Sequence, residues 1–208
     1  MNRRSSCFGA LLLVTACTLA GCGRSDGAAE SAASAPKRGG TVIVAIPVEP
    51  KNLIPYGQNV SLVSEINGFL FRFLADTDST LMGADPGLAE SWQWSADHLE
   101  LTMRLRDGLM WSDGVPLTSD DVRFTLEVQQ DSVVNWSSRS WKLSITSCET
   151  PDARTVRFRF AKTFPDQLRY GKEGYILPRH VYGTLPRDQW EKTERARTPV
   201  GCGPFRLE

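Results

Sequence analysis

The sequence predicts a mixed α/β (α+β) fold, because segments with the periodicity of a strand alternate with segments of helical spacing. Residues 99–105 alternate leucine or methionine with polar and charged residues, and residues 155–161 alternate in the same way. Residues 62–74 instead repeat apolar side chains every three or four positions, as an amphipathic helix does. With 41% hydrophobic residues, six Trp and nine Phe, the chain has enough apolar area for a packed core.

The first predicted strand covers residues 41–46, a nearly continuous run of apolar and β-branched residues. Such a run is typical of a central strand that is covered on both faces. The Pro-rich segment 47–58 ends this strand in a loop. A loop that leaves a sheet at the end of a strand is a common place for a ligand site.

A helix is predicted from residue 61 onward. Its spacing places Phe69, Leu70 and Phe73 in the core and leaves Phe71 on another face. Helical spacing explains these aromatic residues without a cofactor. The Asn67-Gly68 pair predicts a weak point or interruption inside the helix.

Residues 85–127 combine a strand, two turns and a second helix. The strand ends in the turn Asp107-Gly108, and Ser112-Asp113-Gly114 forms another turn. Thr118 has the position of an N-cap, and Asp121 completes the acidic form of a capping box. The adjacent Asp120 and Asp121 could also serve acid/base or metal chemistry, but capping explains both. We predict that this helix ends between residues 130 and 134.

The remaining patterns exclude several classes of function. Lys and Arg number 24, and so do Asp and Glu, so charge predicts no nucleic-acid partner. The sequence lacks a Gly-x-Ser-x-Gly elbow, a His-Glu-x-x-His pair and a P-loop, so we predict no enzyme activity and no cofactor.

His98 and His180 have no metal-ligand spacing and are assigned structural roles. Trp92 and Trp94 fit either packing or a stacking platform for a sugar or base.

The N-terminus has the organisation of a lipoprotein signal. Arg3 and Arg4 form a positive n-region, residues 8–19 an apolar h-region, and LAGC at 19–22 resembles a lipobox. The h-region is short for a membrane span, which needs about 20 residues. We predict a signal over residues 1–21, a lipidated Cys22 and a flexible Gly/Ala/Ser-rich tether over 22–40. A lipobox ending at Cys17 and an ordinary cleaved signal are the alternatives.

Export would leave Cys148 and Cys202 as the remaining thiols in an oxidising compartment. A disulfide between them would close a loop of about 54 residues, which the chain-entropy model equates with about 3–4 kcal/mol. The sequence carries no information on their separation, so both the paired and the free state remain open.

Several motifs resemble, in order and spacing, the family 5 solute-binding proteins of ABC transporters, which include the oligopeptide- and dipeptide-binding proteins. They are PGLAESW (86–92), LRDG (105–108), WSDG (111–114), PLT (116–118), DDV (120–122), ILPRHVY (176–182) and PVGCGPFRL (199–207). Cys202 stands where the family usually has Thr. The resemblance implies a periplasmic-binding-protein type II-like fold, present in part. It also implies a domain order, with residues 41–60 beginning the first lobe, 61–198 forming a small intervening domain and 199–208 returning to the first lobe. Because family members are much longer, it implies an N-terminal fragment without the opposite lobe.

The resemblance also implies where ligand contacts lie. The layout of residues 39–55 matches the family segment that precedes a cleft-lining loop, and this points to Asn59, Val60 and Ser61, mainly through backbone groups. The position after the second helix points to Trp141 and Trp136 as aromatic contacts. An ordinary helix-entry loop and plain packing are the alternatives for these two groups.

The function implied by the resemblance is that of a substrate-binding lipoprotein of a peptide-type ABC importer. Such a protein captures extended peptides between two lobes and delivers them to the membrane permease, as a monomer anchored at the extracytoplasmic face of the membrane. Other members of the same family bind nickel chelates, haem or oligosaccharides. An exported enzyme and an envelope interaction lipoprotein are the alternatives from other classes.

Overall fold

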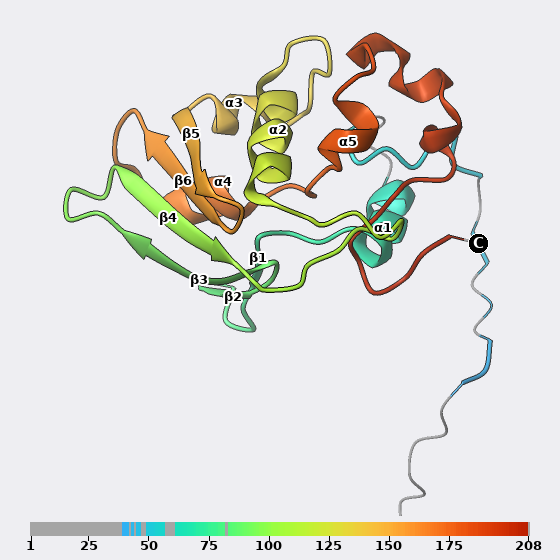
Figure 1. Ribbon diagram of the computed structural model, residues 1–208, viewed down its shortest axis with the longest axis horizontal. Helices are drawn as coiled ribbons and strands as arrows, with labels where there is room; N and C mark the ends of the chain where they lie inside the picture. Colours follow the sequence, from blue (N-terminus) through green and yellow to red (C-terminus); the bar gives the residue numbers. More distant parts are fainter. Residues whose placement is uncertain are drawn as a thin grey trace, which may run out of the picture. The chain divides into compact units, whose positions relative to one another are not determined.

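The computed structural model describes residues 39–41, 43, 45–46, 49–56, 61–81 and 83–207. The chain divides into two compact units, Met1–Val44 and Ala45–Glu208, and the second contains all the helices and strands described below (Figure 1). The helices are α1 (Ser61–Leu70), α2 (Ser119–Gln130), α3 (Arg139–Lys142), α4 (Gln167–Lys172), α5 (Arg179–Tyr182) and the 3-10 helices η1 (Arg187–Lys192) and η2 (Glu194–Ala196). The strands are β1 (Ala75–Thr77), β2 (Ala84–Pro86), β3 (Ala89–Trp94), β4 (Glu100–Leu105), β5 (Ile145–Asp152) and β6 (Thr155–Phe160).

Four antiparallel strands form a sheet in the order β3-β4-β6-β5, and β1 pairs with β2 in a separate hairpin. Leu101 lies opposite Phe158 and Met103 opposite Val156, and all four side chains are buried. The alternation predicted for residues 99–105 and 155–161 is therefore confirmed. Helix α2 lies across this apolar face of the sheet (Figure 1), while Arg157 and its neighbours carry charge on the other face.

Helix α1 confirms the helix predicted from residue 61 but shifts two of its side chains. Phe69 is 57% exposed and contacts Phe205, whereas Phe71 is fully buried. Phe69 lies inside the helix, on the side that faces Phe205. The prediction failed for Phe71 because the helix ends at Leu70, where the carbonyl accepts a hydrogen bond from the backbone of Gly203 (2.8 Å). Beyond that point the chain is extended, so helical spacing no longer decides which side chain faces the core. The predicted weak point at Gly68 does not interrupt the helix.

The prediction of a buried central strand at residues 41–46 is wrong for the residues that the structure describes there. Thr41, Ile43, Ala45 and Ile46 are outside any strand and exposed, and Ile43 is 90% exposed. An apolar β-branched run favours a strand, but a strand also needs partners for its N–H and C=O groups. Within the described part of the chain, neither sheet includes this segment.

The second helix confirms its predicted ends. Thr118 and Asp121 form the capping box, and α2 ends at Gln130. Residues 185–198 contain the two 3-10 helices η1 and η2. Lys142 is the last residue of α3, and strand β5 begins at Ile145.

Candidate functional site

Asp121 has the capping role that the sequence predicts, whereas Asp120 lies in the first turn of the helix without a part in the capping box. Asp121 is 5% exposed, and its Oδ2 accepts hydrogen bonds from the Thr118 N–H (2.9 Å) and the Trp111 indole N–H (3.3 Å). Its Oδ1 accepts the N–H of Arg179 at the start of α5 (2.8 Å). Asp120 instead pairs with Arg123 (2.9 Å) on the surface of α2. Asp121 thus joins the WSDG turn, α2 and α5.

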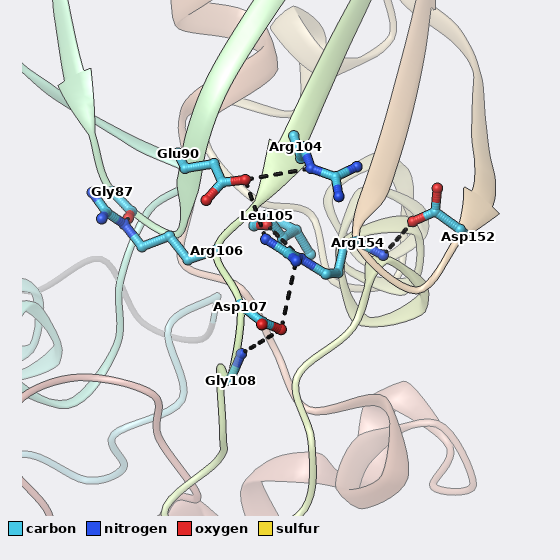
Figure 2. A network of polar contacts seen from close by, with 9 residues as sticks. All are labelled: Gly87, Glu90, Arg104, Leu105, Arg106, Asp107, Gly108, Asp152 and Arg154. Carbon is cyan, nitrogen blue, oxygen red and sulfur yellow. Dashed lines mark hydrogen bonds and ion pairs between the residues drawn. The ribbon is translucent and has the colours of Figure 1, made fainter.

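The LRDG turn is held by an arginine from the β5–β6 hairpin, as Figure 2 shows. The guanidinium of Arg154 donates to the Leu105 carbonyl (3.0 Å) and pairs with Glu90 (3.1 Å) and Asp107 (3.5 Å). Arg106 donates from Nε to the Gly87 carbonyl (2.7 Å). The charged residues of this motif therefore connect β3, β4 and the hairpin, and their contacts are structural.

His180 and Asp113 form an ion-pair contact between the ILPRHVY and WSDG motifs. Their Nε2 and Oδ2 atoms are 2.8 Å apart, and the side chains are 31% and 33% exposed. Burial alone would raise the pKa of Asp113. The hydrogen bond and charge of His180, together with the Val115 N–H, outweigh burial and hold that pKa below its usual range.

Replacing His180 with alanine is expected to raise the pKa of Asp113 toward its ordinary value. The folded-state pKa lies below the unfolded value of about 3.9, so the carboxylate stabilises the fold above that pH. This contribution is lost as pH falls through the lowered pKa. Carbon-13 NMR titration of the carboxyl group measures the change. Asp152, whose pKa is lowered mainly by the Arg154 N–H, is the internal control. An Asp113 titration that is identical in both proteins would contradict the assignment of the shift to His180.

Trp141, one of the two predicted aromatic contacts, belongs to a cluster that we call the Trp141 stack. Its ring lies parallel to that of Tyr170, with centroids 5.4 Å apart and an interplanar angle of 7°. The Arg169 guanidinium lies 5.2 Å from the Trp141 ring centroid, within the range of a cation–π contact. Trp141 comes from α3, and Arg169 and Tyr170 come from α4. The stack offers a half-buried aromatic surface beside an exposed cation.

Trp136 occupies a different setting. Its ring meets the ring of Tyr56 edge-on, with centroids 5.2 Å apart. The Tyr56 hydroxyl donates to the Tyr175 carbonyl (2.6 Å) and accepts from Gln129 Nε2 (2.7 Å). Burial raises the pKa of Tyr56, so the hydroxyl stays protonated and can donate. Trp136 therefore packs beside the loop that leads toward the predicted contacts at 59–61.

The predicted contacts Asn59 and Val60 lie outside the described residues. Ser61 is the first residue of α1. The lipidation site Cys22 and the signal and tether over residues 1–38 also lie outside them. Of the predicted ligand contacts, the structure therefore describes the side chains of Trp136 and Trp141 alone, and it places them in separate aromatic contacts.

Sequence reasoning missed Arg169, Tyr170 and Tyr56 as neighbours of the predicted site residues. Arg169 and Tyr170 lie in a six-residue helix too short for a periodic signal, and their partner Trp141 lies on a four-residue helix. The i,i+4 pair of Arg169 with Glu173 was the one local indication of a helix there.

A groove of about 660 Å³ lies between the β1–β2 hairpin and α4, and Arg169 of the Trp141 stack is one of its lining residues. Trp94, His98 and Phe164 are among its lining residues, and neither Trp136 nor Trp141 lines it. Trp94 also packs against Phe160, with ring centroids 5.6 Å apart, which supports the packing interpretation of this tryptophan. We assign the candidate site by the Trp141 stack and not by the size of this groove.

Cys148 and Cys202 are free cysteines in the structure. Cys148 pairs with Phe158 in the β5–β6 ladder, while Cys202 lies between two glycines whose backbones pack on Leu70 at the end of α1. Burial raises the pKa of each thiol to about 12, so both are protonated at neutral pH. The disulfide that the sequence left open is not formed in the structure.

The described residues include neither a metal site nor a membrane span. No group of three His, Cys, Asp or Glu side chains there is arranged to hold a metal ion. None of the helices in that part of the chain has the length and apolar content needed to cross a membrane.

Comparison with known proteins identifies the family. Residues 83–208 match the family model described as bacterial extracellular solute-binding proteins, family 5 Middle. The match covers more than half of the chain, and the chain therefore belongs to the family 5 solute-binding proteins of ABC transporters, whose members are extracytoplasmic transport proteins.

Individual relatives agree with this assignment. The oligopeptide-binding protein AppA of Bacillus subtilis is 28% identical over an alignment that spans 100% of this chain. The substrate-binding protein CtaP of Listeria monocytogenes superposes with a TM-score of 0.73 at 28% identity, covering 83% of this chain and 35% of that one. NikZ of Campylobacter jejuni, solved with Ni(L-His), gives a TM-score of 0.65 at 26% identity, covering 77% and 31%. The fold is thus that of a type II-like periplasmic binding protein, represented in part.

The chain spans a minor part of the length of its relatives. It covers 39% of AppA and 26% of a peptide-binding protein from Brucella ovis. Activities, ligands and partners of those whole proteins are therefore proposals for this chain.

Proposed function

We propose that this chain takes part in binding extended peptides for an ABC importer. The observation that carries the proposal is the similarity to AppA, which extends along the whole chain and whose solved structure holds a nonapeptide. A peptide backbone presents flat amide groups and a terminal carboxylate. An aromatic surface beside a guanidinium suits both, because rings pack on amide planes and Arg binds carboxylates in a planar geometry.

The proposed mechanism is binding without chemistry. Trp141 packs against the bound peptide, while backbone groups near residues 59–61 provide main-chain hydrogen bonds. The closed, loaded form then docks on the membrane permease, so that ligand shifts the population between open and closed states. A lipid on Cys22 and the 22–40 tether keep the monomeric receptor at the extracytoplasmic face of the membrane. No step makes or breaks a covalent bond.

Replacing Trp141 with alanine is expected to weaken binding of a nonapeptide by about tenfold, because the variant removes one large aromatic contact, equivalent to about 1.4 kcal/mol. Isothermal titration calorimetry of the chain measures the dissociation constant. Leu143→Ala is the matched control, since Leu143 is a nearby apolar side chain that is 49% exposed and outside the stack. Equal affinities of the Trp141→Ala and wild-type proteins would contradict a role of Trp141 in the site.

A second ligand class has specific support. NikZ was solved with Ni(L-His), and a relative from Rhizobium meliloti, 39% identical over 102 residues, is named a periplasmic alpha-galactoside-binding protein. The titration should therefore include Ni(L-His) and an α-galactoside. Binding of either one in preference to the nonapeptide would replace peptide by that solute in the proposal. Hydrolysis of the peptide would instead support an exported enzyme.

A further inference from the structure

Lys142 is a buried cation whose side chain bridges two short helices. It lies on α3, is 2% exposed, and donates from Nζ to the Tyr170 carbonyl on α4 (2.5 Å). The neighbouring residue Trp141 stacks on the ring of that same Tyr170. Adjacent residues of α3 therefore hold Tyr170 by its ring and by its backbone. Removing either contact leaves the other as the direct link from α3 to that residue.

The two helices are too short to fix this geometry by themselves. Helix α3 has four residues and α4 has six, and isolated helices shorter than about 12 residues are marginal in water. On the other side, α3 is tied to α2, because Gln130 Nε2 donates to the Lys142 carbonyl (2.8 Å) and Arg139 Nε donates to the Gln130 carbonyl (2.7 Å). Toward α4, the fixed points are the Lys142 hydrogen bond and the Trp141 stack.

The groups that face Lys142 are few. Glu173, which follows α4, attracts the ammonium, and the Cys148 thiol on β5 is the other titratable group that acts on it. Gln129 on α2 and Lys172 on α4 line the same small cavity. Burial lowers the pKa of Lys142 to about 7 against the attraction of Glu173, while Cys148 remains neutral because its own pKa is raised to about 12. The charge of Lys142 therefore changes near neutral pH.

We propose that Lys142 is a positioning residue: its charged ammonium holds the Tyr170 carbonyl and keeps the Trp141 stack in place, and loss of the proton loosens the stack and weakens ligand binding. A hydrogen bond from a charged donor is about twice as strong as one from a neutral donor. The ligand part of this inference rests on the function proposed for Trp141. The effect of the proton on the stack does not depend on it.

If Lys142 contributed to stability alone, an uncharged residue would suit this buried position better. The unfolded chain keeps the Lys proton up to pH about 10.4, whereas the folded protein releases it near 7, so the free energy of unfolding rises with pH across that window. The charged form is thus the less stable one at this buried position. A methionine of similar length would avoid that cost, and a stable Lys142→Met protein with a displaced stack would separate positioning from stability.

The test follows the indole N–H of Trp141 by proton–nitrogen NMR, with the resonance assigned by its loss in Trp141→Phe. In the wild-type chain the resonance is expected to move between pH 5.5 and 8.5 with a midpoint near 7, and in Lys142→Met it is expected to stay at the high-pH position. Lys172→Met is the matched control: Lys172 is also buried, but its Nζ donates to the Asp76 carbonyl (2.9 Å) and not to Tyr170, so the indole resonance of this variant should still move with pH. A wild-type resonance that does not move overturns the proposal, and this outcome does not depend on the folding of either lysine variant.

The consequence for binding is measured with penta-alanine by calorimetry. The wild-type dissociation constant is expected to rise about fivefold from pH 6 to 8.5, and that of Lys142→Met to be independent of pH. The same pH dependence in both proteins overturns the role of Lys142 in binding. The NMR titration is made without ligand, so an indole resonance that does not move contradicts the positioning role alone. Absence of peptide binding in calorimetry contradicts the proposed function.

Discussion

Replacing Asp121 with alanine is expected to lower the free energy of unfolding by about 4 kcal/mol. The carboxylate accepts hydrogen bonds from Thr118, Trp111 and Arg179, and it is 5% exposed. The variant leaves these three N–H donors without their acceptor in a site with little access to water. An unmade hydrogen bond of a buried donor costs about 1–3 kcal/mol, so the total is large even if the site relaxes. Urea unfolding followed by circular dichroism measures the change.

The neighbouring Asp120 provides the control. It has the same charge and lies in the same first turn of α2, but its side chain is 47% exposed and pairs with Arg123. Asp120→Ala should therefore change the free energy of unfolding by less than about 1 kcal/mol. Similar losses in the two variants would mean that helix charge, and not the three buried donors, determines the effect of Asp121.

Local signals in the sequence predicted the elements that local interactions determine. The alternation in β4 and β6 reflects a sheet with one apolar face, and the capping box at Thr118 is complete within four residues. The carboxylate of Asp121 was correctly assigned to structure for the same reason. What the sequence did not indicate is that Asp121 also accepts the N–H of Arg179, 58 residues further along the chain.

The failures concern interactions between distant segments. Phe71 is buried because α1 ends at Leu70, whose carbonyl accepts a hydrogen bond from Gly203 near the far end of the chain, and Phe69 is half exposed beside Phe205 from that same end. The Trp141 stack could not be found in advance either, since Lys142 and the Tyr170 carbonyl are 28 residues apart and lie on helices too short to show a period. Family resemblance pointed to Trp141, but it gave no indication of the residues that hold it.

Replacing Gly174 with alanine is expected to lower the free energy of unfolding by about 3–5 kcal/mol, by adding a steric conflict to a conformational cost. Gly174 has φ of +106°, a region that L-residues with a side chain rarely adopt. An added Cβ would overlap Gln129 Nε2 and lie 2.6 Å from the Tyr56 hydroxyl. To make room, Gln129 has to leave its hydrogen bonds to that hydroxyl (2.7 Å) and to the Glu173 carbonyl (3.3 Å). Thermal and urea unfolding measure the loss.

Gly108 separates the two contributions to that loss. It has φ of +67°, but nothing lies within 4 Å of an added Cβ, so Gly108→Ala bears the conformational cost alone, about 1 kcal/mol. The difference between the two variants therefore measures the Gln129–Tyr56 contact, which fixes the loop leading to residues 59–61 and the ring against which Trp136 packs. Equal losses in the free energy of unfolding for Gly174→Ala and Gly108→Ala would mean that Gln129 moves aside without cost. Tyr56 would then not be a fixed support for that loop.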